Sequence, residues 1–354
     1  MIILSAGLSM RMGVFKPLLP AGGVPAVVRC AQTAEAANIG EVIVVTGHLH
    51  EDIENALRAL APGARTVYNS RYREGMFSSV HAGVSALQDG FDGFFILPAD
   101  CCAVSPETPA VLAEHFAKNG GKAVIRPKFE GRRGHPPLIP AGFAGALCSY
   151  DGKNGLKGFL SPLPTVEVEM DNPGPLLDMD APEDYAAMLE YLGLPGYPTV
   201  AQCAELLTKY SVPGKIIEHG QQVAKLALEL AGRSKGGGLS KLNPDLLESA
   251  CLLHDIRRTE PDHARAGMEL LLREGFPKAA VLVRDHMDLP SGPAHDIGEL
   301  ELLYLADKLC SSGKIVTLEE RLREMEARLS ANPEALAAAK KRLFHAQTIM
   351  DVLM

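Results

Sequence analysis

A loop rich in small and basic residues follows the first apolar residues of the chain. The segment "SAGLSMRMGVFK" contains Gly7 and Gly13, which let backbone N–H groups approach an anion closely. Arg11 and Lys16 add positive charge to the same loop, enough to attract a triphosphate. Because Met1 to Leu4 has the character of a short buried strand, this loop is expected at its carboxyl end, where α/β proteins bind ligands. The segment predicts a phosphate-binding loop, with an ordinary strand-to-helix turn as the alternative.

Acidic residues at two later positions have the chemistry of a hard-cation site. Asp100 ends the apolar run "GFFILPAD" and is expected at the carboxyl end of a strand, where a carboxylate can hold a cation. Asp178 and Asp180 lie in "LLDMDAPEDY", just before a helix expected to begin at Pro182. Helix capping is the alternative role for Asp178 and Asp180, and Asp184 is expected only to cap the helix.

Ionisable side chains interrupt apolar helical stripes in the second half of the chain. A buried ionisable group costs free energy unless something compensates it. A single histidine on an apolar face is usually a hydrogen-bonded core residue, but several helical segments each present one here. Histidines and carboxylates that converge on one centre predict a metal site. The side chains concerned are His219, His254, Asp255, His263, His286 and Asp307.

The first group of residues carries a resemblance to a known family. "ILSAGLSMRMGVFKPLL" is similar to the "LxAGxSxRMGxxK" signature of the MobA-like nucleotidyltransferases, which include the molybdenum cofactor cytidylyltransferases. "YNSRYREGMFSSVHAG", "EGRRGHPPLI" and "DMDAPEDY" fit the same family. The resemblance implies CTP as the nucleotide, because guanosine-using relatives have glycine at the position of Ala6. It implies nucleotide contacts from Ser5, Ala6, Gly7, Arg11 and Lys16, and a Mg²⁺ site at Asp100 and Asp180.

The implied reaction is attack of an acceptor phosphate on the α-phosphorus, with pyrophosphate as the leaving group. Catalysis then needs positioning and charge neutralisation, which Lys16, Arg11 and Asp100 would supply. The helix that contains Ser78 and Ser79 could receive the acceptor phosphate at its N-terminus. His81 and His135 are candidates for contacts with the acceptor, although a structural role is the alternative.

The identity of the acceptor stays open in the sequence. Cys101 and Cys102 follow Asp100 where molybdenum-cofactor relatives commonly have Gln-Pro. Molybdopterin or a related phosphorylated cofactor precursor is the leading candidate, and a sugar or alditol phosphate is the alternative.

The second group resembles the HD-domain metal-dependent phosphohydrolases. His219, His254, Asp255 and Asp307 fit the core motif of that family, and His263 and His286 resemble the extra histidines of members that hold two metals. The resemblance implies an all-helical fold and one or two transition metal ions, with Fe, Mn, Ni and Zn all compatible with such ligands. It also implies attack on phosphorus by a metal-bound water. Arg257 and Arg258 either hold substrate phosphate or form a solvated helix end, and a nucleotide-binding sensor without turnover is the alternative function.

The pattern of predicted strands and helices divides the chain into two domains of different fold class. Up to residue 192, short β-branched runs alternate with helical stretches, which predicts a Rossmann-like, three-layer α/β nucleotidyltransferase domain with a mostly parallel sheet. Residues 193–199, "GLPGYPT", are expected to form a linker. Helical periodicity dominates residues 200–354, the predicted all-α HD phosphohydrolase domain.

Composition narrows the location and the partners of the protein. The chain has 354 residues and a formal charge of −8, and this negative charge argues against nucleic-acid binding. Its seven cysteines include no C-x-x-C pair, which fits a reducing cytoplasm. The opening apolar stretch is too short for a secretory leader, and no run reaches the roughly 18 residues needed to span a membrane. The expected partners are CTP and a phosphorylated small molecule, with molybdoenzymes as further candidates. The amphipathic tail after Thr317 could form a homodimer, although packing within the chain is the alternative.

Overall fold

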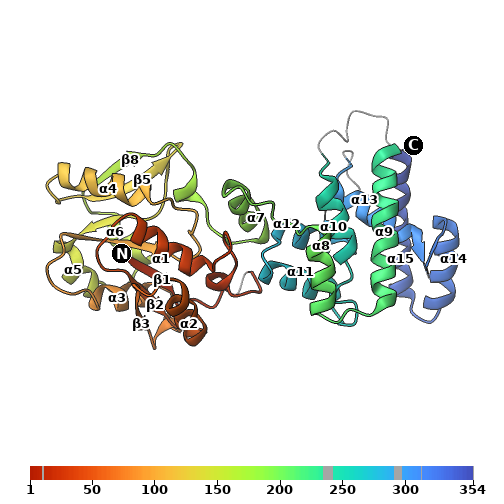
Figure 1. Cartoon of the computed structure of the whole chain (residues 1–354), viewed down its shortest axis with the longest axis horizontal. Coiled ribbons are helices and arrows are strands. Elements are labelled where there is room, and N and C mark those ends of the chain that lie inside the picture. The colour runs from red at the N-terminus through yellow and green to blue at the C-terminus, as the bar shows by residue number, and fades with distance from the viewer. Residues whose placement is uncertain (10–11, 234–241, 291–296, 312, 354) are drawn as a thin grey trace. The chain divides into compact units, whose positions relative to one another are not determined.

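The chain divides into two units. The computed structural model describes residues 1–9, 12–233, 242–290, 297–311 and 313–353. The first unit comprises Met1–Leu194 and the second Pro195–Met354 (Figure 1), so the division falls inside the predicted linker.

The first unit contains a mixed, mostly parallel sheet of eight strands. Seven strands follow the order β3-β2-β1-β4-β7-β5-β6, and β8 pairs with β5. Neighbours from β3 to β4 are parallel, as are β5 and β8, whereas β7 runs antiparallel to both β4 and β5. The strands are β1 Ile2–Ser5, β2 Ile43–Thr46, β3 Arg65–Tyr68, β4 Gly93–Pro98, β5 Val124–Phe129, β6 Arg132–Arg133, β7 Leu138–Pro140 and β8 Thr165–Glu169.

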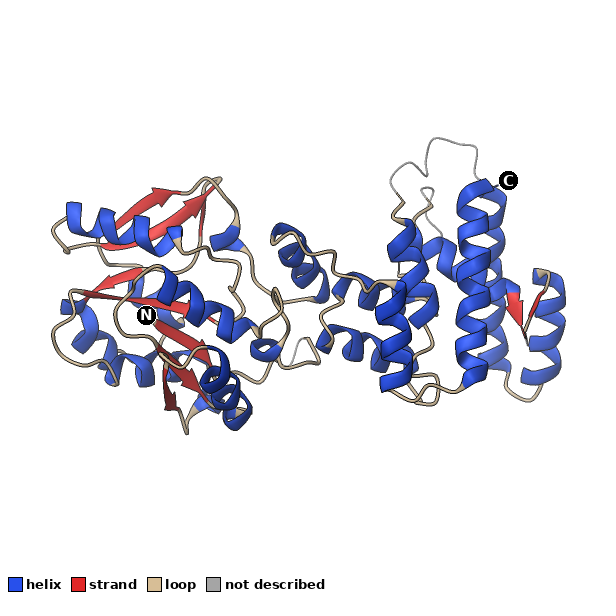
Figure 2. Cartoon of the chain, in the orientation of Figure 1, coloured by secondary structure: helices blue, strands red, loops and turns tan. Residues whose placement is uncertain are grey.

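Helices lie on both faces of this sheet (Figure 2). Ile2 and Leu4 of β1 pack in one core cluster with side chains of α3, α5 and α6, whereas Ile3 points to the opposite face and is also fully buried. Helix α1 contacts β1, and α4 contacts β5. The predicted three-layer α/β class is therefore confirmed. The helices are α1 Ala26–Ala36, α2 His50–Leu60, α3 Met76–Ser85, α4 Glu107–Lys118, α5 Ala144–Cys148, α6 Gly155–Leu160 and α7 Pro182–Tyr191, with the short 3-10 helix η1 at Lys16–Leu18.

The described part of the second unit has helices and one short hairpin as its regular elements (Figure 2). Strands β9 Cys310–Ser311 and β10 Lys314–Ile315 form this antiparallel hairpin, which the sequence prediction of an all-α domain did not include. The helices are α8 Val200–Lys209, α9 Gly214–Arg233, α10 Pro244–Leu253, α11 His263–Arg273, α12 Pro277–Asp285, α13 Glu299–Leu309, α14 Leu318–Leu329 and α15 Pro333–Leu353.

The core of the second unit joins helices that are distant in sequence. Val223 of α9, Ala250 of α10 and Leu303 of α13 are completely buried in one apolar cluster. Leu343 and Ile349 of α15 belong to the same cluster, so the tail of the chain packs within its own unit. None of the described helices combines the length and apolar character required to cross a membrane.

Two candidate active sites

In the first unit, one lysine joins two carboxylates from distant parts of the chain. Lys16 Nζ lies 3.2 Å from Asp100 Oδ2 and donates a hydrogen bond of 2.6 Å to Asp180 Oδ1. The lysine is 7% exposed, so this cation and its two partners meet in a largely enclosed place. The structure thus brings together three of the residues predicted for this site.

Local geometry of the sheet and loop places these three side chains. Leu4 of β1 pairs with Pro98 of β4, and the Ala99 N–H donates to the Leu4 carbonyl at 3.0 Å, so Asp100 emerges beside the loop that follows β1. The Lys16 N–H donates to Ser9 Oγ at 3.1 Å, which closes the loop at the start of η1. Asp180 precedes α7, whose first turn is capped by Asp184 through a 2.9 Å bond from the Ala181 N–H.

Opposing effects act on the charge of Lys16. Burial alone would lower its pKa, but the hydrogen bond to Asp180 and the field of Asp100 outweigh burial and raise the pKa above its ordinary value. Lys16 therefore stays protonated at neutral pH. Burial raises the pKa of Asp178, which accepts a hydrogen bond of 3.1 Å from the Asp180 N–H and so helps to orient that residue.

The phosphate-loop residues line a cavity of about 510 Å³ that also contains the lysine and both carboxylates. Ser5, Ala6 and Gly7 form part of its wall, together with Ser79 at the start of α3. Ser5 Oγ is buried and makes no hydrogen bond with any described residue. Arg11, predicted to bind the triphosphate, lies outside the described residues.

A second cavity, of about 910 Å³, shares Leu4, Met76 and Pro98 with the first and contains several cationic side chains. Arg126 of β5 lines this cavity, and its Nε is buried without a hydrogen-bond partner among the described residues. His135 lines the same cavity with an equally unpartnered Nδ1. Arg133 and Lys157 complete the basic lining.

The other candidates for acceptor contacts have different surroundings. Ser78 and Ser79 both accept hydrogen bonds from Asn69 Nδ2, and Ser78 Oγ also donates to backbone carbonyls, so the Ser78 hydroxyl is engaged in shaping the turn before α3. His81 lies 3.5 Å from Ser85 Oγ and lines neither cavity. Cys102 is buried, which raises the pKa of its thiol to about 12 and keeps it protonated.

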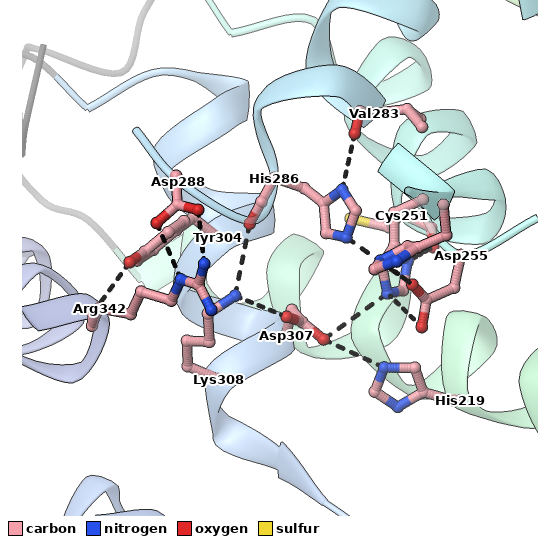
Figure 3. Close-up of polar contacts among 12 residues, drawn as sticks. His219, Cys251, Asp255, Val283, His286, Asp288, Tyr304, Asp307, Lys308 and Arg342 are labelled. Atoms are coloured by element: carbon pink, nitrogen blue, oxygen red, sulfur yellow. Dashed lines mark hydrogen bonds and ion pairs between the residues drawn. The ribbon is translucent and has the colours of Figure 1, made fainter. Parts of the chain in front are cut away.

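In the second unit, all six predicted metal-ligating side chains meet in one cluster (Figure 3 shows several of them). His219 Nε2 lies 3.1 Å from Asp307 Oδ1, and His254 Nε2 lies 3.6 Å from the same oxygen. Asp255 Oδ1 lies 3.3 Å from His263 Nε2 and 3.7 Å from His286 Nε2. Neighbouring imidazole rings are stacked edge to face with centroids 5.1–5.3 Å apart.

Backbone hydrogen bonds orient the two most buried histidines. His254 follows α10, and its Nδ1 bonds to the Cys251 carbonyl at 2.7 Å; His286 follows α12, and its Nδ1 bonds to the Val283 carbonyl at 2.6 Å. Both bonds direct the Nε2 atoms toward the cluster, and Figure 3 shows the one between His286 and Val283. This arrangement is typical of histidines that ligate a metal.

The donor atoms fit two metal ions that share Asp255. One group consists of His219, His254 and Asp255, the other of Asp255, His263 and His286, and the donor atoms of each group lie within 4.8 Å of one another. His254 Nε2, Asp255 Oδ1 and His286 Nε2 are buried without a hydrogen-bond partner among the described residues. Such atoms are costly to leave unpaired, and a bound cation would satisfy them.

The electrostatics of the cluster keep its carboxylates ionised. Burial pushes the pKa of Asp255 upward, but His263, His286 and His254 outweigh it and hold the pKa well below the ordinary value. Burial acts on Asp307 in the same way and is outweighed by Lys308, whose Nζ lies 2.7 Å from Oδ2. Carboxylates that are ionised at neutral pH are ready to bind a metal.

The cluster opens into a cavity of about 670 Å³. Arg258, at 3.6 Å from Asp255, lines it, whereas Arg257 contacts Glu260 and does not. The sequence pattern gave Arg257 and Arg258 the same alternatives, although their surroundings differ. Arg126 and Lys308 were not predicted from the sequence; Lys308 stands directly after Asp307 in "LADKL", a signal that could have identified it.

Both parts of the chain match known families. Residues 1–168 match the MobA-like NTP transferase domain, and residues 216–312 match the HD domain. The chain thus joins a MobA-like nucleotidyltransferase domain to an HD domain, as the motifs predicted. Nucleotidyltransferases use Mg²⁺ and HD domains bind divalent metal, in agreement with the carboxylate pair and the histidine cluster.

Individual relatives cover about half of the chain or less. The molybdenum cofactor cytidylyltransferase of Escherichia coli is 27% identical over 199 residues, which are 53% of this chain and 94% of that protein. A choline-phosphate cytidylyltransferase from Haemophilus influenzae is 34% identical over 104 residues, 28% of this chain and 42% of that protein, so the chain spans less than half of it. A nucleotidyl transferase of solved structure from Methanothermobacter is 25% identical with a TM-score of 0.47, covering 54% of this chain and 96% of that one.

Proposed function

We propose that the protein is a bifunctional enzyme in which residues 1–192 transfer a cytidylyl group from CTP to a phosphorylated acceptor and residues 200–354 hydrolyse a phosphate ester. Residues 193–199 connect the two domains. The main observation that supports the transferase activity is the contact of Lys16 with Asp100 and Asp180 beside the phosphate loop. Both cytidylyltransferase relatives support CTP, as does Ala6 in the loop.

Different residues of the first cavity have different roles in the proposed nucleotidyl transfer. Asp100 and Asp180 would hold magnesium, which neutralises triphosphate charge when it is bound. Lys16, released from its carboxylates, binds the β- and γ-phosphates, and Ala6 and Gly7, which line the same cavity, would offer backbone N–H groups to this anion. An acceptor phosphate oxygen attacks the α-phosphorus, the bond from this phosphorus to the bridging oxygen breaks, and pyrophosphate leaves with the electron pair.

The second cavity of this unit favours an acceptor that carries anionic groups. It contains Arg126, Arg133, His135 and Lys157, against one carboxylate, that of Glu167, which already pairs with Arg133 at 2.6 Å. A quaternary ammonium group would be repelled here. Molybdopterin or a related phosphorylated precursor is therefore the proposed acceptor, ahead of choline phosphate, and a sugar or alditol phosphate is the second candidate.

Calorimetric titration of the full chain with CTP and with GTP, each with Mg²⁺, tests the nucleotide. We expect tighter binding of CTP, and loss of that binding in Lys16→Met. Preference for GTP would contradict the cytidylyltransferase proposal and would assign the loop to another base.

For the second unit we propose a hydrolytic centre with two metal ions, ligated by His219, His254, Asp255, His263, His286 and Asp307. The orphaned buried donor atoms of His254, Asp255 and His286 support this proposal, and a metal there would supply an activated water. Elemental analysis of the purified chain is expected to give about two transition metal ions per chain. Folded protein that contains none and binds no added Fe, Mn, Ni or Zn would contradict it.

A further inference from the structure

We infer that the cavity of the second unit binds an organic diphosphate, with the terminal phosphate at the histidine–aspartate cluster and the inner phosphate at Lys215, Arg321 and Arg328. The apolar group of the substrate lies against α14 and α15. This inference rests on the proposed phosphohydrolase and names its substrate class.

The first observation is the size of the cavity. Its volume of about 670 Å³ lies in the range of sites for whole organic ligands of roughly 300–1,000 Å³. His219, Asp255 and Asp307 form one part of the lining, and α14 and α15 form another. A single phosphate group at the cluster would therefore leave most of the cavity unused.

The cavity is also lined by positively charged side chains that do not contact the histidine–aspartate cluster. Lys215 and Arg328 line the cavity, and neither pairs with a carboxylate or donates a side-chain hydrogen bond to any described residue. Arg321 bonds through Nη1 to Ser311 and Glu324, but its Nε is buried and unpartnered within the described part of the chain. By contrast, Lys308 is held by Asp307, and Arg342 pairs with Asp288 at 2.6 Å (Figure 3). The uncommitted donors fit a second phosphate.

The third observation is an apolar wall from the same two helices. Met325 and Leu329 of α14 line the cavity together with Ala335, Ala338 and Ala339 of α15. Small alanine side chains leave room for a flat or bulky organic group, and its burial against them would be favourable. These helices follow the residues 216–312 that match the HD domain, so this wall lies outside the matched region.

The chemistry is a hydrolysis at the terminal phosphorus. The oxygen of a water attacks that phosphorus, and the bond from this phosphorus to the bridging oxygen breaks. The bridging oxygen keeps the electron pair and leaves as part of the organic monophosphate, while inorganic phosphate is released and one proton of the water passes to solvent. The inner phosphate held by Lys215, Arg321 and Arg328 is the leaving group, so the same cations stabilise its developing charge.

Binding of two non-hydrolysable probes to the full-length, metal-loaded chain tests the inference. Benzyl methylenebisphosphonate carries both anionic groups and the apolar group, and benzylphosphonate lacks the second anion. We expect Arg328→Gln and Lys215→Gln each to weaken the bisphosphonate about tenfold and to leave the monophosphonate within about twofold, as expected for loss of one charged contact. Arg323→Gln is the matched control, because Arg323 lies on the same helix outside the cavity and is exposed. The first unit is identical in all these variants, so their differences report on the second unit.

Equal effects of Arg328→Gln and Lys215→Gln on the two probes, or no effect on either, would overturn the inference. Methylenebisphosphonate without the benzyl group should bind more weakly; equal binding would remove the apolar part of the assignment. If the wild-type chain hydrolyses p-nitrophenyl phosphate while the probes fail these criteria, the proposed hydrolase stands and only the substrate class is wrong. If the chain holds no metal and hydrolyses no phosphate ester, both fall together.

Discussion

At the scale of single residues, the two sites manage buried charge in opposite ways. In the first unit Lys16 contacts both Asp100 and Asp180 directly, so the two carboxylates share a cationic partner before nucleotide binds. In the second unit the donor atoms of His254, Asp255 and His286 remain unpartnered among the described residues, and a bound metal would satisfy them. The sequence could identify these residues because their types are unusual at their positions, but the distances that distinguish the two situations depend on the folded chain.

Replacement of Lys16 by methionine tests the role of this cation. We expect transferase kcat/KM to fall by about 100-fold or more, because a buried charge that stabilises a leaving anion is lost. Steady-state kinetics with CTP and acceptor measure it, with exposed Lys118→Met as the control. Activity within a few-fold of wild type would show that Lys16 only holds the carboxylates together.

The pH dependence of stability gives a second test of Lys16. Its pKa in the folded chain is raised above 10.5, so its contribution to stability is fully present below the unfolded value of about 10.4 and is lost as pH rises through the folded value. We therefore expect the gap in unfolding free energy between wild type and Lys16→Met to be constant from about pH 7 to pH 9 and to shrink as pH rises from about 10.4 through the folded pKa. Chemical denaturation across this range measures it, and a gap that already closes below about pH 9 would contradict a raised pKa.

At the scale of elements, local sequence patterns predicted the positions of strands and helices along the chain better than they predicted which elements lie side by side in the fold. The β-branched runs predicted β2, β4, β5 and β8, because side-chain alternation and composition act locally. The antiparallel insertion of β7 between β4 and β5 was not predicted, since strand order depends on long-range packing that no local period encodes. The wall that α14 and α15 form beside the histidine cluster was missed for the same reason.

Helices α9 and α10 pack so closely at Gly220 that we expect a single added methyl group to destabilise the unit. A Cβ at Gly220 would lie 2.9 Å from the Leu252 carbonyl oxygen and 3.3 Å from that of Cys251, the group that orients His254. We expect Gly220→Ala to destabilise the unit by about 1–3 kcal/mol and to lower metal content.

Gly214→Ala on the same helix is the control, because a Cβ at this position would have no other atom within 4 Å and the added methyl should be neutral or slightly stabilising. Thermal unfolding with and without a chelator measures both variants. Equal melting temperatures for the two variants would show that α9 and α10 can separate without cost.

At the scale of the whole molecule, each unit has its own core and its own set of reactive side chains. The carboxylate–lysine group lies within Met1–Leu194, and the histidine–aspartate cluster lies within Pro195–Met354. From the sequence we predict a boundary near residue 192, because a parallel α/β sheet and a helical domain have different sequence periods. The acceptor and the hydrolase substrate could not be read from the sequence in the same way, since they depend on cavities formed by several elements.

We claim that two independent active sites exist in one chain, and a crossed assay of two full-length variants tests whether their activities separate. Asp100→Ala should abolish nucleotidyl transfer and leave metal-dependent hydrolysis of p-nitrophenyl phosphate unchanged, whereas His254→Ala should do the reverse, with some loss of stability because the remaining ligands lose their metal. Circular dichroism confirms the fold of each variant, and Asp89→Ala, at an exposed position, controls for removal of a carboxylate. Loss of both activities in a folded Asp100→Ala chain would contradict this claim and would indicate one composite active site.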